Sequence, residues 1–131
     1  MKEYLNEELI INDLIIGKRN WRIRHEENFK FNAPHNFEIY DNNSNNIGRA
    51  VDRVLCKIKF QEGALKEHGL NGILDKDLIS IVLCRLQHFQ KSEFATRENA
   101  IAITKLEEAL MWMNKRNANR VMRKVQGTNE K

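Results

Sequence analysis

Two amphipathic segments joined by a five-residue link, KSEFA, constrain the fold of this chain more than any other feature. Within residues 76–90, apolar side chains recur at three- and four-residue spacing, which predicts a helix with one wide apolar face. These side chains are Leu78, Ile81, Val82, Leu86 and Phe89. Within residues 97–120, the same spacing predicts a longer helix with a seam of Ile103, Leu106, Leu110 and Met113. Because the link is short, we expect antiparallel neighbours, an αα-hairpin.

Each predicted helix follows a residue that can cap it. Asp75 and Thr96 carry side-chain oxygens that can accept a hydrogen bond from first-turn N–H groups. In the second helix, Ile101, Met111 and Trp112 lie off the main seam and extend the apolar surface. A two-helix hairpin buries too little surface to be stable alone. We therefore expect the remaining chain and a second copy of the protein to cover this surface.

Extended structure is predicted ahead of the hairpin. Residues 21–37 alternate aromatic and polar side chains, and Pro34 favours extended geometry in the residue before it, so this stretch is predicted to be an arm or an edge strand. Residues 47–60 begin with helical spacing and end in strand-like alternation, which predicts a short helix running into a strand. Residues 5–16 mix both spacings, which indicates an ordered element of undetermined type.

Two loops are predicted between these elements. Residues 41–46, DNNSNN, contain no apolar side chain and are rich in groups that hydrogen-bond their own backbone. Gly63, Gly69 and Gly72 interrupt regular structure three times within ten residues, which predicts a shaped loop or a tight hairpin.

These patterns predict a mainly α fold: an antiparallel helical hairpin preceded by a small extended or β N-terminal part, assembled as a homo-oligomer. The length of 131 residues fits one compact domain. Within it we expect an N-terminal arm and strand/turn region over residues 1–74, the hairpin over 75–124 and a tail over 125–131.

Composition excludes several classes of protein. Hydrophobic residues make up 41% and charged residues 31%, and no apolar run approaches the length of a membrane span. The first fourteen residues include four acids and do not resemble a signal peptide, so we expect a cytoplasmic protein. Cys56 and Cys84 lack metal-site spacing and are expected to be small buried residues rather than a disulfide.

Residues for catalysis are scarce. The four histidines are scattered without a recognised catalytic or zinc pattern. Glu107 and Glu108 are consecutive, so on a helix they point about 100° apart and cannot form a close carboxylate pair. We expect a protein that is not an enzyme and that needs no cofactor or metal.

Residues suited to binding an anion are easier to find. Thr96, Arg97 and the amides of Glu98 and Asn99 would meet at a helix N-terminus, which favours an anion, and Lys91 lies in the same link. A guanidinium can hold two phosphate oxygens at once. The alternative is a simple N-cap beside a surface arginine.

Two further segments have both a binding interpretation and a structural one. Phe31 and Phe37, on either side of Pro34, could stack on a nucleobase or anchor the core. Residues 115–124 contain five basic residues and no acid, and could attract phosphate or complement the C-terminal dipole of a helix.

The run RENAIAITKLEEALMW, residues 97–112, together with Phe29, Lys30, Phe31 and Pro34 upstream, resembles a known family. It is similar to the helical-hairpin domain of phage anti-CBASS and anti-Thoeris sponge proteins, in which an aromatic arm precedes a helix, a short link and a second helix. The resemblance covers residues 75–120 well and the arm weakly. Residues 60–74 are similar to a segment of the longer relatives of that hairpin.

The resemblance implies immune evasion by sequestration in the cytoplasm of an infected host. The family binds cyclic di- or trinucleotides, or cyclic ADP-ribose isomers, uncleaved, in pockets between subunits of a homo-oligomer. Carried over by position, Thr96, Arg97 and Phe31 match motif positions near the ligand, and Pro34 belongs to the arm. Arg85 is a basic candidate from the first helix, and Lys91 follows from its charge alone. The predicted ligand-binding residues are therefore Phe31, Pro34, Arg85, Lys91, Thr96 and Arg97.

This sequence departs from the compact family members in three ways. Ala95 stands where a proline often precedes the link, Phe31 replaces a frequent tyrosine, and extra chain precedes the hairpin. A missing tyrosine hydroxyl removes a donor that can discriminate bases, so the choice of messenger does not carry over.

Two other functions remain as alternatives. One is a nucleic-acid-binding regulator acting through residues 115–124, which the modest net charge of +4 and the lack of a recognition motif disfavour. The other is a protein-interaction module that uses the surplus apolar surface of the hairpin.

Overall fold

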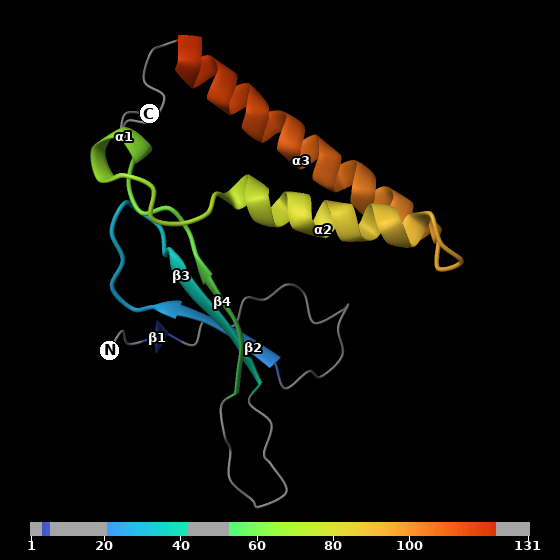
Figure 1. The fold of residues 1–131 in the computed structure, drawn as a ribbon, viewed down its shortest axis with the longest axis horizontal. Helices are drawn as coiled ribbons and strands as arrows, with labels where there is room; N and C mark the ends of the chain where they lie inside the picture. Colours follow the sequence, from blue (N-terminus) through green and yellow to red (C-terminus); the bar gives the residue numbers. More distant parts are fainter. Residues whose placement is uncertain (1–3, 6–20, 42–52, 123–131) are drawn as a thin grey trace, which may run out of the picture. The chain divides into compact units, whose positions relative to one another are not determined.

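The structure is a computed structural model that describes residues 4–5, 21–41 and 53–122. The chain forms two compact units, residues 1–62 and 63–131, which are described separately. The first unit contains an antiparallel sheet and the second contains the helices (Figure 1).

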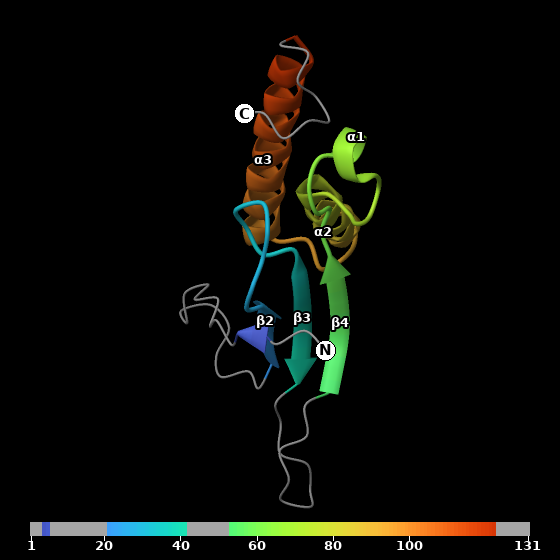
Figure 2. The same ribbon diagram turned by 90° about the vertical axis from the view of Figure 1, so that its left-hand side faces the viewer.

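The sheet of the first unit has four strands in the order β1-β2-β3-β4, each antiparallel to its neighbour. They are β1 (Tyr4–Leu5), β2 (Trp21–Glu26), β3 (Asn36–Asp41) and β4 (Arg53–Lys59). Figure 2 shows β2, β3 and β4 side by side. The β3–β4 register shifts between Ile39 and Tyr40, which marks a bulge.

One face of this sheet is mainly apolar. The register pairs Ile23 with Ile39 and Phe37 with Ile58, and alternation puts all four on the same face. His25 shares this face, and its ring meets Phe37 edge-on with centroids 5.7 Å apart. Phe37 meets Phe60 in the same way at 5.6 Å. These edge-to-face contacts extend the packing to the residue after β4.

Ionic contacts join the strands on the opposite face. The Arg24 Nε donates to Glu38 Oε1 at 2.9 Å, and the guanidinium lies 4.2 Å from the centre of the Tyr40 ring. Lys57 Nζ lies 3.9 Å from the other Glu38 oxygen. Glu38 and Tyr40 are both buried, so the Glu38 carboxylate needs these cations to offset the cost of its desolvation.

The prediction of an arm or an edge strand over residues 21–37 is only partly correct, because β2 and β3 are both inner strands of the sheet. This stretch contains β2, a turn and the start of β3, so the chain reverses direction inside it. The backbone at both ends of this stretch is extended, as predicted. A hydrogen-bonded turn separates the two extended segments. The alternation near Cys56 and Ile58 does form a strand, β4.

Several predictions fall partly outside the described residues. The expected helix from residue 47 and most of the 5–16 element lie there; Leu5 belongs to β1. In the expected 41–46 loop, Asp41 instead ends β3, and the remainder is not described.

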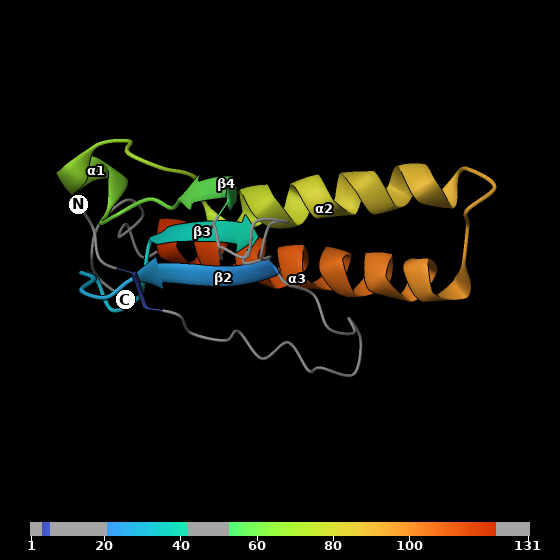
Figure 3. The same cartoon turned by 90° about the horizontal axis from the view of Figure 1, so that it is seen from below.

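The second unit contains α1 (Leu65–His68), α2 (Asp75–Gln90) and α3 (Arg97–Met122). The helices α2 and α3 lie side by side in opposite directions (Figures 1 and 3), which confirms the predicted αα-hairpin. Among the described residues, no helix is long and apolar enough to cross a membrane.

The predicted shaped loop lies ahead of α2. Gly63 has a φ of 75° and Gly69 has a φ of 73°, a region that favours glycine. Gly69 ends α1 by donating its N–H to the Leu65 carbonyl at 2.9 Å. Glycine is therefore needed at both positions to shape this loop.

Two local predictions are wrong. Asp75 is the first residue of α2 rather than its cap; Leu74 occupies the N-cap position, and its N–H donates to Asp77 Oδ2 at 2.8 Å. Asp75 and Asp77 still lie in the first turn of α2, where the positive end of the helix dipole stabilises their carboxylates. Cys56 and Cys84 are free as expected but exposed rather than buried.

The hairpin leaves a large apolar surface, as its sequence predicted. No residue of α2 or α3 is buried. The large apolar side chains exposed on these helices include Ile81, Val82, Phe89, Ile101, Met111, Trp112, Val121 and Met122. Packing between the two helices alone therefore does not supply a core.

Candidate functional site

The link between α2 and α3 is closed by a pair of hydrogen bonds between Gln90 and Thr96. The Gln90 Nε2 donates to the Thr96 carbonyl at 2.9 Å, and the Thr96 N–H donates to Gln90 Oε1 at 3.1 Å. Because one side-chain amide bonds both backbone groups of one residue, the start of α3 is fixed against the end of α2.

Thr96 also caps α3, as its sequence position predicted. Its Oγ1 accepts a hydrogen bond from the Asn99 N–H at 3.0 Å. This hydrogen bond occupies the Asn99 amide, which was expected to face an anion. One fewer backbone amide at this helix end is therefore available to an anion. Within the link, Ser92 Oγ donates to the Phe89 carbonyl at 2.6 Å and accepts from the Phe94 N–H at 3.1 Å.

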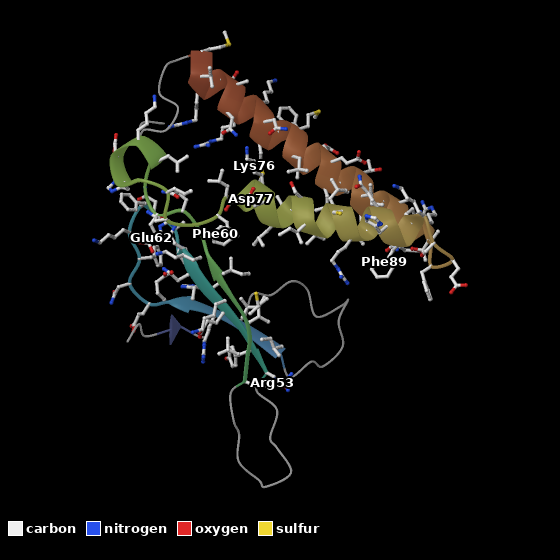
Figure 4. All side chains as sticks on the ribbon, viewed as in Figure 1. Arg53, Phe60, Glu62, Lys76, Asp77 and Phe89 are labelled. Carbon is white, nitrogen blue, oxygen red and sulfur yellow. The ribbon has the colours of Figure 1, made fainter. Side chains whose placement is uncertain are left out.

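Beside this link lies a hollow of about 390 Å³. It is lined by Cys84, Arg85, His88, Phe89, Ser92 and Phe94. The Arg85 guanidinium lies 5.6 Å from the centre of the Phe89 ring, and Figure 4 shows Phe89 near the link end of α2. Aromatic rings beside a guanidinium suit a planar aromatic group that carries an anion.

The other two predicted residues of the hairpin are cations at the ends of the link. Lys91 is the C-cap of α2, and its backbone N–H donates to the Gln87 and His88 carbonyls at 3.2 Å each. Arg97 is the first residue of α3. Both side chains are exposed, so the link presents positive charge to solvent next to the hollow.

Phe31 and Pro34 lie in the other compact unit, in the turn that joins β2 to β3. Phe31 has a φ of 57° and is 40% exposed, while Pro34 is half-buried. The Phe31 ring meets His35 at 6.2 Å between centroids. Phe37, by contrast, packs into the apolar face of the sheet. The six predicted residues thus form two groups, four at the hairpin link and two in this turn.

Sequence reasoning missed the aromatic residues of the hollow. Phe89 was assigned to the apolar seam of the first helix, and Phe94 in the link was given no role. Phe94 offered a signal, because a large apolar residue inside a short polar link is poorly placed for a core. The three link residues that precede it, Lys91, Ser92 and Glu93, are all polar.

The remaining candidate residues have structural partners. His25 and His35 are buried, and each bonds a backbone carbonyl, that of Glu26 at 2.7 Å and that of Lys30 at 2.6 Å. Lys115 of the basic segment lies over the Trp112 ring at 5.1 Å. Within the described parts of the chain, no three or more acidic, histidine or cysteine side chains group as a metal site.

Comparison with known proteins identifies a family model and a phage relative that match this chain. The family model described as "Acb2/Tad1, hairpin domain" matches residues 52–118, which run from the start of β4 through most of α3. The chain is also 43% identical over 135 residues to "Thoeris anti-defense 1" of Bacillus phage SBSphiJ7. That match covers 89% of this chain and 95% of the relative.

Proposed function

Because the chain belongs to the Acb2/Tad1 hairpin-domain family, we propose that it is a phage anti-defence protein that sequesters a cyclic nucleotide messenger of bacterial immunity. The observation that carries this function is the match to "Thoeris anti-defense 1" over nearly the full length of both chains. The messenger belongs to the cyclic di- and trinucleotides or the cyclic ADP-ribose isomers. The protein acts in the host cytoplasm during infection.

The hairpin link supplies groups for both parts of such a ligand. Arg85, Lys91 and Arg97 provide positive charge for phosphate, and Thr96 holds the helix end from which Arg97 projects. The Phe89 and Phe94 rings offer apolar surface for a base or a ribose. A ligand that combines a flat ring with phosphate would use both kinds of contact.

The turn between β2 and β3 contributes Phe31 and Pro34. An exposed phenylalanine ring offers a π-face on which any nucleobase can stack. We assign these two residues to base contact and the cations of the link to phosphate contact.

We propose that capture takes place in a homo-oligomer. The exposed apolar side chains of α2 and α3 fit burial against a second copy. A two-fold interface presents each basic residue twice, which matches a ligand with two similar phosphates. The ligand pockets of this proposal therefore lie between subunits.

In this function the protein binds the messenger and does not change it chemically. Removing a messenger from solution requires only affinity and a concentration of protein comparable with that of the ligand. The messenger should therefore be recovered intact when the complex is denatured.

Isothermal titration against cyclic di- and trinucleotides and cyclic ADP-ribose isomers, followed by mass spectrometry of the released ligand, tests this function. Submicromolar binding with an unaltered ligand mass is the expected result. A changed mass would establish an enzyme. An absence of binding across the panel would favour the protein-interaction alternative, for which the exposed apolar surface of the hairpin is the supporting observation.

A further inference from the structure

The turn that joins β2 to β3 holds its backbone in an unusual conformation. Phe31 and Asn32 are consecutive and have φ values of 57° and 70°, in the left-handed region that side chains other than glycine rarely adopt. Such backbone strain persists only where surrounding contacts hold the chain in place, and it is concentrated at ligand-contacting segments. The contacts that hold this turn therefore bear on its function.

The side chain that joins the two ends of the turn is Glu26, the last residue of β2. It is only 4% exposed. One carboxylate oxygen accepts the His35 N–H at 2.9 Å, and the other accepts the Asn36 N–H at 2.9 Å and the Asn36 side-chain amide. A buried carboxylate is stable only when it is hydrogen-bonded in this way. Glu26 thus fixes the point at which the chain enters β3.

His35 transmits this constraint to the tip of the turn. Its side chain is buried, and its Nε2 lies 2.6 Å from the Lys30 carbonyl, so this nitrogen carries the proton and donates. The His35 ring also meets the Phe31 ring edge-on. The contacts therefore run from Glu26 through His35 to the residue before Phe31 and to the Phe31 ring itself.

We infer that Glu26 is a positioning residue, which holds the turn so that the Phe31 ring is presented to the ligand in one orientation. This inference rests on the proposed function, because it takes Phe31 as a base contact. A ring that is ordered before binding loses less conformational freedom when a base stacks on it. Glu26 itself touches no ligand; it acts through the turn.

The test is a double-mutant cycle on messenger affinity with Glu26→Gln, Phe31→Ala and the combined variant. In the wild-type background, Glu26→Gln should weaken binding about tenfold, because a buried carboxamide cannot accept all three hydrogen bonds. In the Phe31→Ala background it should cause no further loss, because the ring that Glu26 positions is already absent. Equal losses in both backgrounds, or unchanged affinity for folded Glu26→Gln, would overturn the inference.

Glu38→Gln is the matched control. Glu38 is also a buried carboxylate of this sheet, at 5% exposure, but it pairs with Arg24 rather than with the turn. Glu38→Gln should lower the unfolding midpoint. In a double-mutant cycle with Phe31→Ala, it should show a coupling energy of zero for messenger binding. If Glu26→Gln does not fold, Asn36→Ala removes one donor to Glu26, together with the hydrogen bond to Glu62 Oε1, and keeps the backbone bond to Glu26; the same cycle applies.

A second readout needs no ligand. With fluorinated phenylalanine incorporated, Phe31 should give one dispersed ¹⁹F resonance in the wild-type protein, assigned by its loss in Phe31→Ala. That resonance should move to the shift of an unordered ring in Glu26→Gln. An unchanged resonance would overturn the positioning role even if the wild-type protein binds messenger. A wild-type protein with an ordered ring and no affinity for any messenger would instead refute the proposed function.

Discussion

At the scale of single residues, Gly63 and Gly69 form a matched pair around α1. Both have φ near 75°, so a side chain at either position is strained. They differ in their surroundings: a Cβ built on Gly63 would overlap the His68 ring, whereas a Cβ on Gly69 would meet nothing within 4 Å. Backbone strain and steric overlap can therefore be measured separately in this loop.

We predict that Gly63→Ala lowers the free energy of unfolding by about 2 to 3 kcal/mol and Gly69→Ala by about 1 kcal/mol. The strain is common to both variants, so the difference reports the overlap with the His68 ring. Urea denaturation followed by circular dichroism measures both. Combining Gly63→Ala with His68→Ala should recover part of the loss. Equal effects of the two glycine substitutions would show that the ring moves aside at little cost.

Arg97, at the start of α3, tests the proposed phosphate contact. We predict that Arg97→Ala weakens messenger binding by about 1.5 to 3 kcal/mol, the range for a charge-assisted hydrogen bond. Arg97→Lys should recover only part of this, because an ammonium cannot hold two phosphate oxygens as a guanidinium does.

Arg116→Ala is the control for this prediction. It removes the same charge from the same helix, but Arg116 lies in the C-terminal half of α3. Titration calorimetry at two salt concentrations separates a direct contact from a general charge effect. Similar losses for both arginines would assign the effect of Arg97 to net charge and remove it from the site.

At the scale of elements, the link of the hairpin depends on Thr96. We predict that Thr96→Ala lowers the free energy of unfolding by about 1 kcal/mol, because it removes the oxygen that caps the Asn99 N–H. Thr104→Ala is the control on the same helix: the Thr104 hydroxyl donates to the Ala100 carbonyl one turn earlier, and its loss should be neutral or stabilising. Thermal unfolding of both variants measures the difference. Equal midpoints would show that the cap adds nothing beyond the Gln90 bonds.

The elements predicted well from the sequence are those that their own residues specify, without distant contacts. The periodic apolar residues of α2 and α3 predicted both helices to within two residues at each end, because helical spacing repeats over many residues. The sheet was predicted poorly, since the turn that divides residues 21–37 depends on Glu26 accepting bonds from His35 and Asn36, about ten residues away. Nothing in the local spacing marks Glu26 as buried.

The candidate site likewise has one part that local sequence predicted and one part that it did not. The Thr96 cap was predicted, because its position before an apolar run is a local signal. The hollow was not, because it brings Arg85 and Phe89 from α2 together with Phe94 from the link, and only the folded hairpin makes them neighbours. Asp75 was predicted to cap α2, but Leu74 occupies the N-cap position and Asp77 accepts its N–H, because the exact start of a helix depends on backbone hydrogen bonds that spacing does not specify.

At the scale of the whole molecule, the exposed stripe of α3 that holds Ile101 and Trp112, with Lys105 and Glu108 between them, is the feature to test. Ile101 and Trp112 are eleven residues apart, about three helical turns, and so share one face. Trp112 is 56% exposed in the single chain, although tryptophan contributes more to protein interfaces than almost any other residue. If a second copy covers this stripe, a charge placed on it must be desolvated on association, which costs far more than a lost contact.

We therefore predict that Trp112→Glu reduces the mass of the assembly measured by light scattering after size-exclusion chromatography. Asn114→Glu adds the same charge two residues away, at an exposed position on roughly the opposite face, and should leave the mass unchanged. If messenger pockets lie between subunits, Trp112→Glu should also lose affinity without any change at the hairpin link. A dissociated Trp112→Glu that binds messenger normally would place the ligand site within one chain, and a wild-type protein that is monomeric at micromolar concentration would assign the stripe to a different partner.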